Sequence, residues 1–410
     1  MARNNRFPLS VSTIAALAFL FTSATMLPVA SAAKSAEPDI QRIRASAERG
    51  VIDKQIELGA AYFQGRGVGQ NEKLAAYWYE KAAGAGDPVA QEQIGYFYQT
   101  GLGVPLDPAK AVHWFQLAAA GGLASAKVNL GVAYVWGLGV PKNTAMALQL
   151  FHEALDKKIG NAAFDLGDMY YFGHGVPIDK AAAEHWFEAG VKLHDVPSEY
   201  RLALMLSEDK DHANLHREVD LLRESANAGY VPAMYSLGLL LVNSPEFAGS
   251  IQEAIPLLDE ASKAGTWRSS VVLGLLERDG KGMPADDRAA LYHFQLAILQ
   301  GGDVAERLVK KDVAILAVKV GEEQAASTQS EAGYWYQQHH LALQFIYKDG
   351  YNRRQFPAFA LAVPEAGAHA GRLVPTPTAA EGQLSLGSSG GRASKEGESD
   401  QPLAKSFVEE

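Results

Sequence analysis

Apolar residues recur at helical spacing along most of the chain, in blocks that glycine-rich turns separate. In the block 52–63, for example, Ile56, Gly59, Ala60 and Phe63 lie three or four residues apart, which places them on one face of a helix. A second helical block runs from 72 to 83, and glycines follow both blocks. The pattern predicts pairs of short helices joined by tight turns.

The helical pairs repeat with a fixed period. One reference residue in each first helix marks it, and the spacing is 36 residues with a single 35-residue step: Gly59, Gly95, Gly131, Gly167, Ala203, Gly238 and Gly274. A constant period of this length is typical of stacked supersecondary units, each of which contacts only its neighbours. We therefore predict an all-α fold, an α-solenoid of about seven helix-turn-helix repeats.

The turn inside each pair is also repeated. Gly-x-Gly-Val occurs at 65–68, 101–104, 137–140 and 173–176, and a similar turn is found at 280–283. Two units lack it and have 207–211 and 243–246 instead, so we expect altered connections there. The segment 40–50 resembles a lone second helix, and 303–320 and 324–343 are predicted to be capping helices, which a solenoid needs at its ends.

The motif as a whole resembles the Sel1-like repeat, a relative of the tetratricopeptide repeat. The residues that carry the resemblance in the first full unit are Leu58, Gly59, Tyr62, Gly65, Gly67, Val68, Trp78, Tyr79, Ala82 and Ala83. The resemblance covers about 45 to 305 and implies a right-handed superhelix whose first helices form the inner wall. It also implies an exported bacterial-type protein that binds other proteins.

The two ends of the chain differ from the repeats. Residues 1–32 have a basic start with Arg3 and Arg6, an apolar stretch, and small residues before Ala33, which is the order of a secretory signal peptide. An uncleaved anchor is the alternative. The solenoid with its caps is expected at 33–350, and 351–410, rich in Gly, Ala, Pro and Ser, is predicted to be disordered. The expected location is periplasmic or secreted.

Composition narrows the classes of partner. The chain has no cysteine, so it has no disulfide, no thiolate nucleophile and no cysteine-based metal site. Its formal net charge is −10, and loss of Arg3 and Arg6 with the signal peptide would make it −12. A negative surface argues against nucleic acid and anionic membranes as partners. We expect protein partners, leave polysaccharide open, and make no prediction of the oligomeric state.

Catalytic chemistry is not indicated. The glycine turns lie between two helices, whereas a phosphate-binding loop joins a strand to a helix. His212 and His216 are four residues apart, but they sit in a charged, solvated segment without a third ligand. No serine elbow or distinctive carboxylate pair stands out. We therefore predict no enzyme activity, no catalytic residue, no cofactor and no metal site.

Three positions of each first helix are not needed by the repeat motif: two before, one after and five after the reference residue. We refer to these as the wall positions. They hold Glu57, Ala60 and Gln64, then Gln93, Tyr96 and Thr100, then Asn129, Val132 and Trp136, then Asp165, Asp168 and Phe172. Variable polar and aromatic residues on one face suit a binding groove. The predicted partner-binding residues are Gln93, Tyr96, Asn129, Trp136, Asp165, Asp168 and Phe172. Alternatively, this is an ordinary solvated face whose aromatic residues close onto the turns.

The predicted function is an exported scaffold or adaptor that holds a partner segment along the inner wall. The resemblance implies three settings, namely envelope polysaccharide export, regulation of a membrane signalling receptor, and engagement of host proteins. A first alternative is a protein that binds or hydrolyses a cell-wall or polysaccharide fragment, with aromatic residues stacking on sugars. A second alternative is that the carboxy-terminal tail is the functional element and the solenoid only presents it.

Overall fold

The computed structural model describes residues 40–208 and 214–348, and within these ranges all regular structure is helical. The predicted signal peptide at 1–32 and the predicted disordered tail at 351–410 lie outside the described residues. The elements are α1 Ile40–Glu48, α2 Ile52–Gln64, α3 Glu72–Gly84, α4 Pro88–Thr100, α5 Pro108–Ala120, α6 Ala124–Trp136, α7 Thr144–Leu155, α8 Gly160–Phe172, α9 Lys180–Lys192, α10 Val196–Ser207, α11 Leu215–Asn227, α12 Val231–Asn243, the 3₁₀ helix η1 Pro245–Ser250, α13 Ile251–Lys263, α14 Trp267–Asp279, α15 Asp287–Val320 and α16 Glu322–Lys348.

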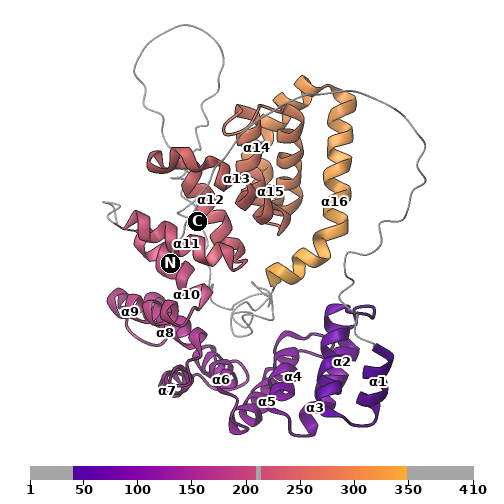
Figure 1. Ribbon diagram of the computed structural model, residues 1–410, viewed down its shortest axis with the longest axis vertical. Coiled ribbons are helices and arrows are strands. Elements are labelled where there is room, and N and C mark those ends of the chain that lie inside the picture. Colours follow the sequence, from indigo (N-terminus) through magenta and orange to yellow (C-terminus); the bar gives the residue numbers. More distant parts are fainter. Residues whose placement is uncertain (1–39, 209–213, 349–410) are drawn as a thin grey trace, which may run out of the picture.

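The helices form seven pairs, which confirms the predicted α-solenoid. The even-numbered helices from α2 to α14 are the first helices, and the odd-numbered helices from α3 to α15 are the second helices. Each first helix packs against its own second helix, and each second helix packs against the next first helix. In Figure 1 the array follows an arc, with α2, α4, α6 and α8 toward its inside and α3, α5, α7 and α9 along its outer edge.

The reference glycine lets an aromatic ring approach the first helix closely. A Cβ atom added to Gly167 would lie 2.3 Å from Cε1 of Phe187, which is fully buried. Equivalent rings face four other reference glycines: Tyr79 at Gly59, Phe115 at Gly95, Phe151 at Gly131 and Phe294 at Gly274. Only glycine leaves room for the ring. The glycine therefore recurs with the 36-residue period because each of these repeats makes this contact between its two helices.

The turns are built in the same way from repeat to repeat. Gly101 follows α4 with φ 72°, a conformation that favours glycine. The chain then turns back toward α4 at Asp107, whose backbone N–H donates a hydrogen bond to the carbonyl oxygen of Tyr98 at 2.8 Å. Its carboxylate accepts from the N–H of Lys110 at 3.0 Å and caps α5. Each turn therefore ends one helix and starts the next.

The irregular units and the ends of the array also follow the predictions. The connection after α12 is the 3₁₀ helix η1, which replaces the glycine turn, whereas 209–213 lie outside the described residues. Helix α1 is a lone second helix in front of the array. Helix α15 is interrupted at Gly302, where φ is 58° and ψ −144°, so its second part is the first predicted cap and α16 is the second. No helix in the described ranges is both long enough and apolar enough to cross a membrane.

Candidate binding wall

The wall positions of the first helices define the inner wall. Figure 1 places α2, α4, α6 and α8 on the inner side of the arc, so their exposed face turns toward the space that the arc encloses. Beyond α8 the same positions hold Arg201, Leu204 and Glu208 on α10, Ser236, Leu239 and Asn243 on α12, and Val272, Leu275 and Asp279 on α14. The wall thus changes from polar and aromatic in its middle to apolar at its carboxy-terminal end.

Two of the predicted residues near the amino-terminal end are interior side chains. Tyr96 is 6% exposed and packs against Phe97, with ring centroids 6.4 Å apart. Asn129 is 2% exposed and donates from Nδ2 to Oε1 of Glu92 at 3.1 Å. Burial raises the pKa of Glu92, and a hydrogen bond from Ser125 opposes the shift. The bond between Asn129 and Glu92 joins neighbouring repeats, and Gln93 is half-buried on the same helix as Glu92.

The predicted aromatic residues form a row with a histidine of the intervening turn. The rings of Trp136 and His174 meet edge-on with centroids 4.6 Å apart, and His174 stacks on Phe172 at 5.6 Å. The guanidinium carbon of Arg201 lies 5.2 Å from the centroid of Phe172. Burial, together with the positive charge of Lys142, lowers the pKa of His174. Both aromatic residues therefore close onto the turn and still flank the wall.

Asp165 and Asp168 lie side by side in the middle of the wall. They are three residues apart on α8, which puts both carboxylates on one face. Oδ1 of Asp168 is 3.2 Å from Nε of Arg201, and the two side chains are 17% and 20% exposed. The pair is an ion pair without a hydrogen bond, because neither atom has a hydrogen-bond partner. Oδ2 of Asp165 is covered from solvent and also has no hydrogen-bond partner.

The protonation of these carboxyls reflects their surroundings. Burial raises the pKa of Asp165 well above its usual value, and the charges of Asp168 and Asp195 add to the shift. Burial also raises the pKa of Asp168, while Arg201 opposes that shift. Asp168 lies beside a guanidinium, whereas the charged neighbours of Asp165 are carboxylates, so Asp165 is the harder of the two to ionise.

Sequence reasoning did not single out the acids where α10 begins. Asp195 caps α10, because its Oδ2 accepts from the backbone N–H of Ser198 at 3.0 Å and from the hydroxyl at 2.6 Å. Burial raises the pKa of Asp195 to about 6, although both bonds from Ser198 oppose it. Burial, then the charges of Glu224 and Asp195, raise the pKa of Glu199 to about 7. The order Asp-x-Pro at 195–197 was the available signal, since Asp87 and Pro88 cap α4 in a similar way.

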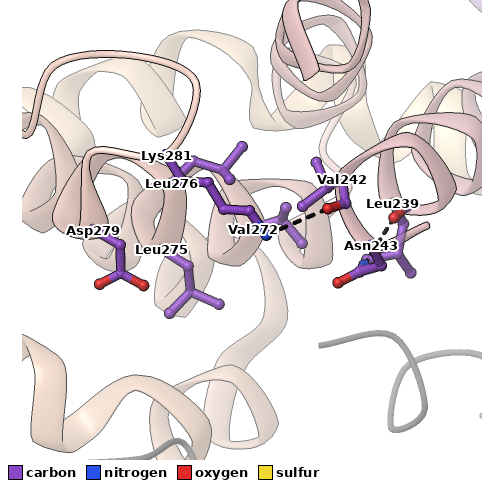
Figure 2. Close-up of a pocket in the computed structure, with 8 residues that line it drawn as sticks. All are labelled: Leu239, Val242, Asn243, Val272, Leu275, Leu276, Asp279 and Lys281. Carbon is purple, nitrogen blue, oxygen red and sulfur yellow. Dashed lines mark hydrogen bonds between the residues drawn. The ribbon is translucent and has the colours of Figure 1, made fainter. Parts of the chain in front are cut away.

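The apolar end of the wall contains a small pocket. Figure 2 shows it between α12 and α14, where Leu239, Val242, Val272, Leu275 and Leu276 line its floor. Polar side chains stand at its edge: Asn243, Asp279 and Lys281. The amide of Asn243 donates to the carbonyl of Leu239 at 2.8 Å. Five of the eight lining residues occupy wall positions, so the pocket opens on the inner wall.

Candidate metal ligands are not assembled. Within 40–208 and 214–348, no three histidine, aspartate or glutamate side chains are grouped so that they could hold a metal ion. His216 instead lies 3.3 Å from Oε1 of Glu246, and His212 falls outside the described residues.

The fold defines a helical-repeat solenoid, and its inner wall is formed by positions that the repeat motif leaves variable. The family model of the Sel1 repeat matches 55–87, 88–123, 124–158, 160–195 and 271–302. These five segments are therefore Sel1 repeats, as their motif predicted. The matches stop at residue 195 and resume at 271, so they omit α10 to α13, where the structure nevertheless continues the same helical pairing.

Solved structures with a similar arrangement of helices include three bacterial proteins. A Sel1 repeat protein from Oxalobacter formigenes is 26% identical, with a TM-score of 0.46 over 55% of this chain and 100% of that one. A protective antigen of uropathogenic Escherichia coli is 21% identical, with a TM-score of 0.39 over 81% and 76%. The immunity protein Pa5087 from Pseudomonas aeruginosa is 17% identical, with a TM-score of 0.36 over 53% and 83%. No curated protein matches the chain.

Proposed function

We propose that this protein is an exported scaffold that binds a segment of a partner protein along its inner wall. Sel1 repeat proteins generally mediate protein–protein interactions, and the fold is typically a non-catalytic scaffold. Export is proposed from the order of basic, apolar and small residues in 1–32. The cellular settings that we propose for it are envelope assembly, polysaccharide export or signalling regulation.

The observation that carries the proposal is the pocket between α12 and α14. Its floor is apolar and its edge is polar, which is the composition of a protein-binding site. It is formed by positions that the repeat motif leaves free, whereas the buried side of each helix is occupied by the glycine–aromatic contacts. The pocket has room for about one water molecule, so a partner would cover its apolar floor from outside, with no change in the array itself.

The test begins with affinity capture of the chain from residue 33 onward out of an envelope fraction, with mass spectrometry of the bound proteins. The captured partner is then measured against Asn243→Arg, which places a long cationic side chain across the pocket. Asn227→Arg is the matched control, because Asn227 ends the second helix α11 and is exposed. We expect the first variant to lose the partner and the second to retain it. Equal binding by both variants would rule out the wall as the binding surface.

The two alternative functions are tested with the same captured partner. The binding or hydrolysis of a polysaccharide fragment gains no support from the comparisons. A functional tail is tested by truncation after Lys348, because the array ends there. Loss of the captured partner without loss of helicity would move the function to the tail.

A further inference from the structure

The middle of the inner wall contains polar atoms that the fold leaves unused. Asn161, Asp165 and Asp168 are four and three residues apart on α8, so they follow one another along the same face. Oδ1 of Asn161, Oδ2 of Asp165 and Oδ1 of Asp168 are all covered from solvent, and none of them accepts a hydrogen bond. Buried oxygen atoms in native proteins nearly always have a donor, so three on one helical face point to a donor that comes from outside.

Asp165 and Asp168 have different charged neighbours. Asp165 is faced by Asp168 on its own helix and by Asp195 from the turn before α10, and Asp195 in turn lies within reach of the charge of Glu199. The guanidinium of Arg201 is the cation paired with Asp168, and its Nε makes no hydrogen bond. Asp168 is paired with this guanidinium, whereas the charges that act on Asp165 are those of other carboxylates, so an added cation would complete the balance.

Arg201 also shows, within the molecule, which cation fits. Its guanidinium lies beside Asp168 and above the ring of Phe172 at 5.2 Å, and it approaches Phe164 at 5.9 Å. Carboxylate on one side and aromatic ring on the other is an arrangement that suits the side chains of arginine and lysine. Trp136 continues this row of rings toward α6.

We propose that Asp165 and Asp168 receive a lysine or arginine side chain of the partner segment that lies along the inner wall. The inference rests on the proposed function and adds the chemistry of the partner. The same segment runs on toward the pocket between α12 and α14, where it places an apolar side chain. The partner is therefore a protein whose exposed segment has a basic residue and, further along, an apolar one.

The experiment uses the chain from residue 33 onward and a displayed library of random twelve-residue peptides. Selections are run in parallel on the unmodified protein, on Asp165→Asn and on Glu57→Gln. Glu57 is the matched control, because it occupies the same repeat position on α2 but pairs with Lys54 at 2.5 Å. Since the whole protein is acidic, the comparison between the two variants removes any general preference for basic peptides.

We expect lysine and arginine to be enriched on the unmodified protein and on Glu57→Gln, and to lose that enrichment on Asp165→Asn. A selected peptide should bind Asp165→Asn about ten-fold more weakly in fluorescence anisotropy, and its lysine→norleucine version should bind both proteins equally. Circular dichroism of the variants confirms that both are folded.

Two results would overturn the inference. One is peptide binding without a preference for basic residues, together with loss of that binding in Asn243→Arg, which would keep the proposed wall function and remove the basic partner. The other is a basic preference that Asp165→Asn retains in full. Failure of the proposed function is recognised separately, because a captured partner would then bind Asn243→Arg and Asn227→Arg alike.

Discussion

The regular repeats and the two irregular repeats of this solenoid pack their two helices together through different residues. From α2 to α9, and again at α14 and α15, a reference glycine faces an aromatic ring and a glycine turn joins the helices. In α10 the reference residue is Ala203, in α12 it is Gly238 facing Leu258, and neither unit has the glycine turn. The family model matches the first group and omits the second. The helices therefore still pair where the motif is absent, so other residues can support the same pairing.

The irregular repeat at α10 buries an acid at a position where two regular repeats have an amide. At the position four before the reference residue, Gln55 and Gln91 donate their amides to the carbonyls of Ala47 and Ala83 in the preceding unit. The same position in α10 holds Glu199, which is 5% exposed. An ionised carboxylate cannot donate a hydrogen bond, so this repeat carries a cost that the regular repeats avoid. The cost lies next to Asp165 and Arg201, where we place the partner.

The largest expected effect is a loss of stability in a regular repeat. Gly167→Ala puts a methyl group 2.3 Å from the ring of Phe187, and we expect the free energy of unfolding to fall by about 3 kcal/mol. Urea unfolding followed by circular dichroism measures it. Gly84→Ala is the control, because no atom lies within 4 Å of its added Cβ, and it should be neutral or stabilise by less than about 1 kcal/mol. A mild effect of Gly167→Ala would show that the ring contact does not explain the period.

The sequence predicted this period, the seven pairs, the lone second helix at the start of the array, the caps and the altered connection after α12. It did not identify the partner of the glycine. In α3, α5 and α9 a tryptophan precedes a second aromatic residue, and Trp114 and Trp186 are only partly buried. The residue after the tryptophan, Phe115 or Phe187, is the one that is fully buried against the glycine. Two adjacent aromatic residues on a helix face in different directions, and composition alone does not say which of them points inward.

The wall was predicted by position and only in part by residue. Asp165 and Asp168 were included, and their coupling to Arg201 follows from the same wall position one repeat later. The comparison of wall positions ended at the fourth repeat, so this signal was missed. The pocket between α12 and α14 could not be anticipated, because it depends on how two successive helices approach each other. Tyr96 and Asn129 fit the pattern but are buried, since contacts between repeats decide exposure as much as position on the helix does.

A second prediction concerns the buried carboxylate of Glu199 in the irregular repeat. In the folded protein the pKa of Glu199 is raised from 4.5 to about 7, so the folded state binds its proton more tightly than the unfolded state does. The wild-type protein therefore loses stability as the pH rises from 4.5 to 7, and the loss is complete above 7. Glu199→Gln mimics the protonated acid and should be more stable by about 1–2 kcal/mol at pH 8, a value reduced for solvent screening.

The measurement is the melting temperature of Glu199→Gln and the wild-type protein between pH 4.5 and 8.5. The difference should be largest at high pH and should become small near pH 4.5, where Glu199 is protonated in the folded state and half protonated in the unfolded state. Glu57→Gln, at an exposed site, should show no such trend. An equal gain at every pH would mean that the charge of Glu199 is not the cause.

The smallest expected effect concerns the helix caps of the two kinds of repeat. In the regular repeats the second helix begins with a side-chain cap, and Asn143 accepts from the N–H of Met146 at 3.1 Å. In the irregular repeat α13 begins after Ser250, whose side chain makes no cap hydrogen bond. Asn143→Ala should therefore cost about 1 kcal/mol, whereas Ser250→Ala should cost close to nothing. Urea unfolding of the two variants measures both, and equal losses would contradict the distinction. Since α13 is held without a cap, its position must depend on the packing of Ala254 and Leu258 against α12, which is also the helix that forms the pocket.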